Sequence, residues 1–203
     1  MVVISRFLLC CVLLISSCGS TMATSNGCSM YWNEHSFPIK VAVDNTFDIR
    51  ERASTVMALM RWNHAVGKTV FVFSPRPLNN IEEGISLTHK KLPGTYVGLC
   101  PAFFYANEEG LNGRIWRGTC ALDNTKMDPL LFPEGYIRVI VHELGHALGF
   151  PHTINRPETY MNPSVSFIPK DKLVFTEDEI TTLRNMMHGT YKRKTIGGKT
   201  TCL

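Results

Sequence analysis

Several features that define other classes of protein are rare or missing in this sequence. Charged side chains make up only 19% of the 203 residues, and the longest apolar run is the short one from Phe7 to Ile15. These values argue against a disordered tail, a collagen or a protein with several transmembrane helices. No CxxC pair and no internal repeat occurs, which argues against a zinc ribbon, a CxxC redox site and a repeat protein. The chain is therefore expected to form one globular domain.

Positive charge is concentrated at one end of the chain. The formal net charge is +4, and without the four basic residues of the last dozen the chain has as many basic as acidic side chains. Those four residues are Lys192, Arg193, Lys194 and Lys199. A nucleic-acid site would spread its charge over a folded face, so we expect a solvated basic tail over 192–203 and no nucleic-acid partner. A polyanion-binding arm is the alternative.

The first 23 residues have the order of a secretory signal. Arg6 precedes the apolar run, and small residues follow it. The run is too short to span a bilayer, so residues 1–23 are predicted to be removed and the protein to be extracytoplasmic. Residues 15–18 also resemble a bacterial lipobox, in which Cys18 would be lipidated and attach the protein to a membrane. Cleavage after Ala23, which would secrete the protein, is the alternative.

Four cysteines remain once the signal segment is set aside, an even number that fits an oxidising compartment. We expect Cys100 to pair with Cys120 between two strands, and Cys28 to pair with Cys202 near the two ends of the chain. Four free thiols are the alternative.

Apolar spacing predicts three helices. The first extends from about 47 to 66 and can end at Gly67, the second covers 133–148, and the third begins at Thr176 with a capping box. The stripe that indicates the first helix consists of Ile49, Ala53, Val56, Met57, Met60 and His64. Strands are predicted at 37–44, 70–73, 85–87, 95–99 and 115–122. This order of elements indicates an α+β domain over 24–191.

The second helix carries the residues with recognisable chemistry. His142 and His146 are four residues apart, so both imidazoles project from one face and can bind one zinc ion. Gly149 lets the chain turn back, and His152 then supplies a third nitrogen. Three protein ligands leave one zinc position open to water, as in catalytic sites. Glu143 would lie beside that water and act as general base.

This HExxHxxGxxH pattern resembles the signature of the metzincin zinc peptidases. The resemblance implies a zincin-like α+β fold: a twisted mixed sheet, an active-site helix, a methionine turn under the metal and a C-terminal helix. Met161, in the segment 160–163, matches the turn methionine. The chain is most similar to the matrixins, over about Phe37 to Tyr191, with Arg61-Trp62-Asn63 and Ala102-Phe103-Phe104 among the matching segments.

The resemblance implies a secreted or lipid-anchored metalloendopeptidase with one catalytic Zn²⁺. It would cleave protein or peptide substrates by a zinc-activated water, with Glu143 as general base and His142, His146 and His152 as ligands. We expect a monomer. Two alternatives remain open at this point: a zinc amidase acting on cell-wall peptide, and a binding protein whose peptidase is vestigial.

Overall fold

The structure is a computed structural model that describes residues 31–100, 102–105, 114–164, 173–190, 193–196 and 199–202. The predicted signal segment, Cys18 and Cys28 lie outside these residues. Within the described part of the chain, no helix combines the length and apolar character needed to cross a membrane.

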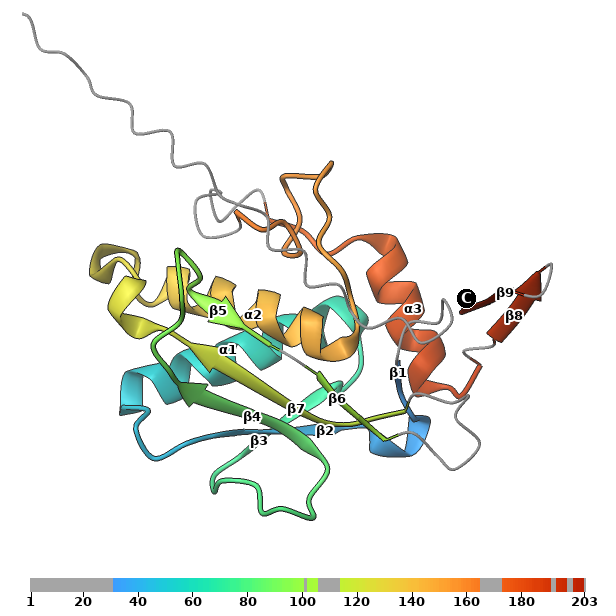
Figure 1. Cartoon of the computed structure of the whole chain (residues 1–203), viewed down its shortest axis with the longest axis horizontal. Coiled ribbons are helices and arrows are strands. Elements are labelled where there is room, and N and C mark those ends of the chain that lie inside the picture. Colours follow the sequence, from blue (N-terminus) through green and yellow to red (C-terminus); the bar gives the residue numbers. More distant parts are fainter. Residues whose placement is uncertain are drawn as a thin grey trace, which may run out of the picture.

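A mixed sheet forms the centre of the domain (Figure 1). Its path runs β1-β7-β4-β2-β3, with parallel pairing throughout, and β5 and β6 pair with β7 in the antiparallel direction. The strands are β1 (Tyr31–Trp32), β2 (Ile39–Val43), β3 (Phe71–Ser74), β4 (Gly84–His89), β5 (Gly98–Leu99), β6 (Ala102–Tyr105) and β7 (Arg114–Leu122). The α+β class predicted from the sequence is therefore confirmed.

Three α-helices accompany the sheet: α1 (Ile49–Val66), α2 (Glu134–Leu148) and α3 (Glu177–Met187). Helices α1 and α2 pack against each other and against strands of the sheet (Figure 1). Short 3₁₀ helices occur at η2 (Glu34–Ser36), η3 (Asn124–Lys126) and η4 (Pro129–Leu131). The predicted C-terminal ends of α1 and α2 are confirmed, since Gly67 and Gly149 have positive φ. The predicted beginning of α3 is confirmed as well, since Thr176 forms a capping box with Glu179.

The apolar stripe that predicts α1 does not form the buried face of that helix. Ile49, Met57 and Met60 are 80%, 48% and 56% exposed. The buried side chains are instead Glu51, Ser54, Thr55, Ala58, Leu59, Trp62 and Val66. Polar residues can occupy this face because the Ser54 and Thr55 hydroxyls donate to helix carbonyls four residues earlier, which satisfies them without water.

Two buried tryptophans hold α2 in place. The Trp62 indole N–H donates to Val141 O at 3.1 Å, and the Trp32 indole N–H donates to Ala147 O at 2.8 Å. Both side chains are 0% exposed, so each contributes a large buried surface as well as a hydrogen bond. The helix that carries the HExxH pattern is thus fixed from α1 and from β1.

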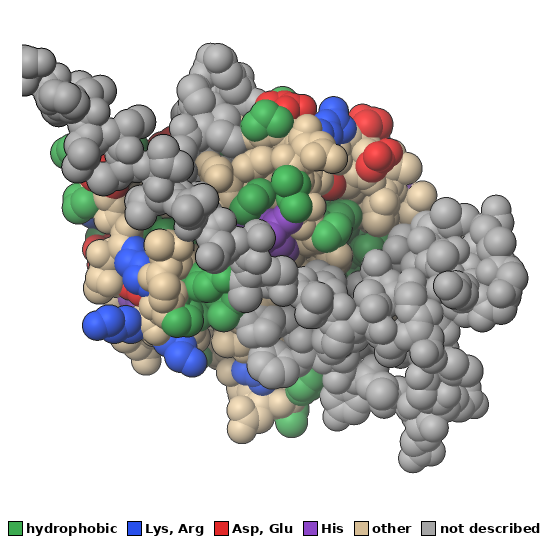
Figure 2. Space-filling model, turned by 45° about the horizontal axis from the view of Figure 1, so that its top comes forward, with side chains coloured by type: hydrophobic (Ala, Val, Ile, Leu, Met, Phe, Trp, Pro, Cys, Tyr) green, Lys and Arg blue, Asp and Glu red, His purple; other side chains and the backbone are tan. Residues whose placement is uncertain are grey.

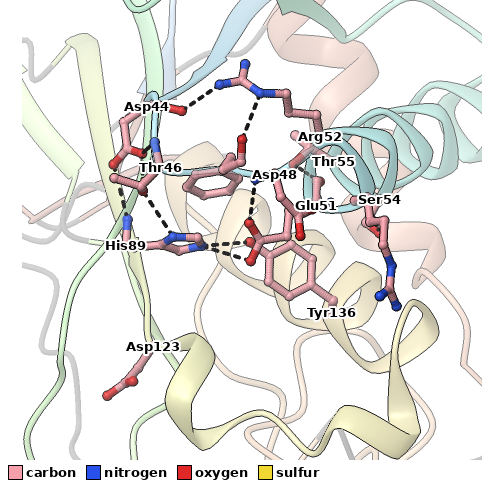
Figure 3. Close-up of polar contacts among 12 residues, drawn as sticks. Asp44, Thr46, Asp48, Glu51, Arg52, Ser54, Thr55, His89, Asp123 and Tyr136 are labelled. Carbon is pink, nitrogen blue, oxygen red and sulfur yellow. Dashed lines mark hydrogen bonds and ion pairs between the residues drawn. The ribbon is translucent and has the colours of Figure 1, made fainter.

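A polar cluster lies where β2, β4 and the beginnings of α1 and α2 meet (Figure 3). The His89 ring stacks on Phe47 with 4.2 Å between centroids, and its Nε2 lies 3.2 Å from Glu51 Oε1 and 3.3 Å from the Tyr136 hydroxyl. Glu51 also belongs to the capping box of α1 with Asp48. The cluster links both helices to the sheet.

The predicted disulfide between Cys100 and Cys120 is present and joins β7 to the segment between β5 and β6. The predicted pairing of Cys28 with Cys202 stays a prediction, because Cys28 lies outside the described residues. The segment expected to be a basic tail contains an antiparallel pair of strands, β8 (Arg193–Ile196) and β9 (Lys199–Cys202). Four pairs of residues face each other across these two strands.

The strand predicted at 95–99 is only two residues long, as β5. The carbonyls of Leu92, Gly94 and Tyr96 accept hydrogen bonds from the Lys126 ammonium. Within the predicted strand, Val97 O accepts a backbone hydrogen bond from Asp123 N, but Tyr96 O accepts from the Lys126 side chain, so regular strand pairing begins only at Gly98.

Candidate metal centre

The second helix and the turn after it bring three histidines together. His142 and His146 lie one helical turn apart on α2, and the helix ends at Gly149, which has φ 102°. Only glycine adopts this conformation without strain, and it redirects the chain so that His152 returns to the helix. Among the described residues, these three histidines are the only group of His, Cys, Asp or Glu side chains arranged to hold a metal ion.

The three Nε2 atoms converge on one point. The distances are 3.0 Å between His142 and His146, 3.1 Å between His142 and His152, and 3.0 Å between His146 and His152. Nitrogen ligands of a tetrahedral zinc ion, with bonds of 2.0–2.1 Å, lie about 3.3 Å apart. The arrangement therefore fits one zinc ion, and imidazole is among the ligands that zinc prefers.

Hydrogen bonds direct two of these Nε2 atoms. Nδ1 of His142 donates to Tyr160 O at 2.7 Å, and Nδ1 of His146 donates to Phe150 O at 2.9 Å. Because a carbonyl only accepts, both rings carry their proton on Nδ1 and present a lone pair at Nε2. Burial lowers the pKa of His142 to about 3 and that of His146 to about 4, and burial also lowers the pKa of His152. At neutral pH all three are the neutral imidazoles that a metal needs.

Glu143 is buried beside the first histidine. Its side chain is 4% exposed, and burial raises its pKa to about 8. Within the described part of the chain, its Oε2 has no hydrogen-bond partner. A carboxylate with an unsatisfied buried oxygen next to converging imidazoles is suited to hold a water or take a proton there. A bound dication would counteract the effect of burial on this pKa.

Gly98 of β5 lies directly against the Glu143 carboxylate. A Cβ placed on Gly98 would be 2.6 Å from Glu143 Cδ and closer still to Oε1. Only glycine permits this approach, so the strand backbone limits where the carboxylate can lie. Gly98 was not among the residues predicted from the sequence, although a glycine within a strand pattern often marks a close backbone contact.

Met161, the predicted turn methionine, is buried against α2. It is 0% exposed, and a Cβ on Gly145 would clash with its sulfur and lie 3.1 Å from its methyl group. Gly145 therefore makes room for Met161 against α2. The Trp62 ring lies on the same side of Gly145, where it would be 3.3 Å from a Cβ placed on that glycine.

An ion pair between the helices supports the methionine segment. Arg61 donates two hydrogen bonds to Glu134, at 2.9 and 2.7 Å, and a third to the Tyr160 hydroxyl at 3.2 Å. Tyr160 in turn provides the carbonyl that orients His142. This chain of contacts connects α1, the start of α2 and the first histidine. Neither Tyr160 nor Glu134 was predicted from the sequence to have this role.

The site is open on one side. His146 and His152 are half-buried, whereas His142 and Glu143 are buried. In the space-filling view, histidine side chains reach the surface between hydrophobic side chains (Figure 2). A small molecule or peptide could therefore reach the converging nitrogens from this face.

The chain is similar to several solved structures. One is high choriolytic enzyme 1, a hatching enzyme zinc-protease from Oryzias latipes (Medaka fish), at 22% identity over 64% of this chain and 52% of that chain, with a TM-score of 0.37. Another is archaemetzincin from Methanopyrus kandleri, at 17% identity over 74% and 96%, with a TM-score of 0.45. A third is myroilysin, at 18% identity over 66% and 55%, with a TM-score of 0.35. The chain spans about half the length of the hatching enzyme.

A search of curated protein sequences finds no match. The matrixin family model matches residues 119–188, which contain α2, all three histidines, Glu143 and Met161. Over these residues the chain resembles the matrixins, and the three-histidine group that they contain is suited to bind one zinc ion.

Proposed function

We propose that this protein is an exported zinc-dependent endopeptidase. The observation that carries the proposal is the convergence of three imidazole Nε2 atoms, 3.0–3.1 Å apart, beside the buried carboxylate of Glu143. His142, His146 and His152 would hold the metal. A bound zinc ion supplies Lewis-acid chemistry there, polarising the scissile carbonyl and acidifying a water.

Glu143 would carry the proton during hydrolysis. Its carboxylate takes a proton from the attacking water, and the same group then gives a proton to the leaving amine nitrogen. Burial increases the proton affinity of this carboxylate, which favours the first transfer. The water oxygen bonds to the peptide carbonyl carbon, the C–N bond breaks, and a carboxylic acid and an amine are the products.

The edge of the sheet offers a place for an extended peptide. Strands β5 and β6 pair with β7, and neither has a second partner among the described strands. An unpaired strand edge can bind a substrate backbone as an added strand. The segment Ala102–Tyr105 would therefore align the peptide next to Glu143, which β5 already contacts through Gly98.

Export is supported by the disulfide. The bond between Cys100 and Cys120 is stable in oxidising compartments, which agrees with the secretory signal expected over residues 1–23. A lipidated Cys18 would attach the protein to a membrane, whereas cleavage after Ala23 would release it, and mass spectrometry of the mature N-terminus distinguishes the two. The domain 24–191 would carry the activity, and residues 192–203 would be a basic tail. The protein would act as a monomer.

The proposal is tested with a mixed peptide library and the purified protein. We expect cleavage to stop when a chelator removes zinc, because the ion that would acidify the attacking water is then absent. Cleavage should return when zinc is added back, because the three neutral imidazoles can bind the ion again. Cleavage that continues in the metal-free protein would contradict the proposal. If zinc binds one per chain but no peptide is cleaved, the endopeptidase assignment is wrong and a non-protein amide becomes the substrate to examine.

Replacing Gly98 with alanine should displace the Glu143 carboxylate. The added Cβ would be 2.6 Å from Cδ, so the carboxylate must move, and a shift of about 1 Å in a catalytic group can cost about 100-fold in rate. We expect kcat to fall by about that factor while zinc content stays at one per chain. Gly118→Ala on β7 is the matched control, since its Cβ would meet nothing closer than 3.3 Å. Equal activity of both variants would show that Gly98 does not position Glu143.

A further inference from the structure

The Lys126 ammonium lies inside a ring of backbone oxygens away from the histidines. Its Nζ is 2.5 Å from Leu92 O, 2.8 Å from Gly94 O and 3.2 Å from Tyr96 O. An ammonium has three N–H groups, so these three carbonyls use all of them. Asp123 Oδ2 is a fourth oxygen, at 3.3 Å.

Asp123 is a fixed charge in this ring. Its side chain is 1% exposed and accepts hydrogen bonds from the backbone N–H groups of Leu92, at 2.8 Å, and Thr125, at 3.2 Å. The Thr125 hydroxyl donates to it as well, at 2.6 Å. These hydrogen bonds, with Thr125 first, lower the pKa of Asp123 to about 2. The carboxylate is therefore ionised and needs a cation nearby.

This set of oxygens has the composition of a site for a hard cation. Three carbonyls come from alternate residues of one loop and the carboxylate comes from the end of β7, and carbonyl and carboxylate oxygens are the ligands that Ca²⁺ takes in proteins. We propose that Leu92, Gly94, Tyr96 and Asp123 form a cation site that the protein fills with its own Lys126 ammonium in place of a metal ion. The side chain is part of the chain, so the site needs no ion from the medium.

The ring fixes the segment that leads to the edge of the sheet. Asp123 N donates to Val97 O at 2.8 Å, and Lys90 N donates to Leu122 O at 3.0 Å, so the segment is bound to the end of β7 on both sides of the ring. Gly98 follows directly and lies against Glu143. Lys126 is thus placed to position β5, and through β5 the candidate general base. The cation site itself does not depend on the proposed peptidase function.

The test replaces Lys126 with glutamate in the full protein. A glutamate carboxylate ends about one bond short of the lysine ammonium, which leaves room for an ion among five or more oxygens. The K126E protein should unfold at a Tm at least about 5 °C higher in about 10 mM CaCl₂ than in EGTA, which is the shift for a site near saturation in a domain of this size. Calorimetric titration should find one more Ca²⁺ per chain than in wild type. Mg²⁺ should have a smaller effect because it demands shorter, octahedral bonds.

Two further variants make the outcome specific. K126M, which keeps the length but not the charge, should have a lower Tm than wild type and gain no response to Ca²⁺. The double variant D123N/K126E should lose the response of K126E. The proposal is overturned if K126E responds to Ca²⁺ no more than wild type does, or if K126E fails to fold in Ca²⁺ while K126M folds. All readouts are unfolding and binding, so failure of the peptidase proposal would leave them unchanged.

Discussion

Replacing Glu143 with glutamine is expected to lower kcat by about 10²–10⁴-fold while zinc stays bound at one per chain. Glutamine has almost the same shape but cannot take a proton, so the variant removes the general base and little else. Glu143 is not one of the three converging histidines, and the orientation of His142 and His146 depends on the carbonyls of Tyr160 and Phe150. The measurement is single-substrate kinetics together with metal analysis of the same preparation.

The stability of this variant gives a second readout. The Glu143 carboxyl is buried, and within the described residues its Oε2 has no partner. Burial raises its pKa to about 8, so in the metal-free protein this carboxyl is mostly protonated at neutral pH, and glutamine replaces one neutral group with another of nearly the same shape. We therefore expect the metal-free Glu143→Gln protein to unfold at about the same Tm as wild type at pH 7. A variant that retains wild-type turnover would refute the role of Glu143, and one that loses its zinc would show that Glu143 helps to hold the metal.

Replacing His146 with alanine should remove both the metal and the activity. Two imidazoles remain, and a catalytic zinc ion needs three protein ligands to stay bound. We expect substoichiometric zinc after dialysis, no detectable peptide cleavage, and loss of the rise in Tm that zinc gives the wild-type protein by binding only the folded state. Metal analysis and thermal unfolding with and without zinc measure these effects.

His64→Ala is the control for this variant. His64 is exposed on α1 and lies outside the three-histidine group, so its removal should change neither zinc content nor cleavage. Full zinc binding by the His146 variant would contradict the assignment of the ligands. Together, the Glu143 and His146 variants separate the chemical step from metal binding, because only the second should lose the ion.

The helices could be predicted because their signals are local. A glycine that must adopt a positive φ ends α1 and α2, and a threonine with a glutamate three residues later begins α3. The spacing of His142, Glu143 and His146 on one helix, with Gly149 before His152, also depends only on neighbouring residues. Local geometry was therefore sufficient to predict that the three histidines lie together.

The buried face of α1 could not be predicted in this way. Its apolar residues at 49, 57 and 60 are exposed, while Ser54 and Thr55 are buried. A second set of positions with the same helical period contains Trp62, and the contacts of that large ring with Phe71, Phe150 and Phe175 determine which side faces inward. Those partners come from three other segments, so periodicity within the helix does not reveal them.

The class of the domain and the helix that carries the histidines could be predicted from the sequence alone, because they follow from short-range spacing and from composition. The pairing of Cys100 with Cys120 was the favoured prediction, and it needed the structure to exclude free thiols at these two positions. Long-range packing is needed to place Gly98 against Glu143, and to bring Arg61 into contact with both Glu134 and Tyr160. It also places Lys126, away from the histidines, among the carbonyls of 92–96. Each of these contacts joins residues 30 or more positions apart. Their geometry depends on how the sheet and helices pack, which no local pattern encodes.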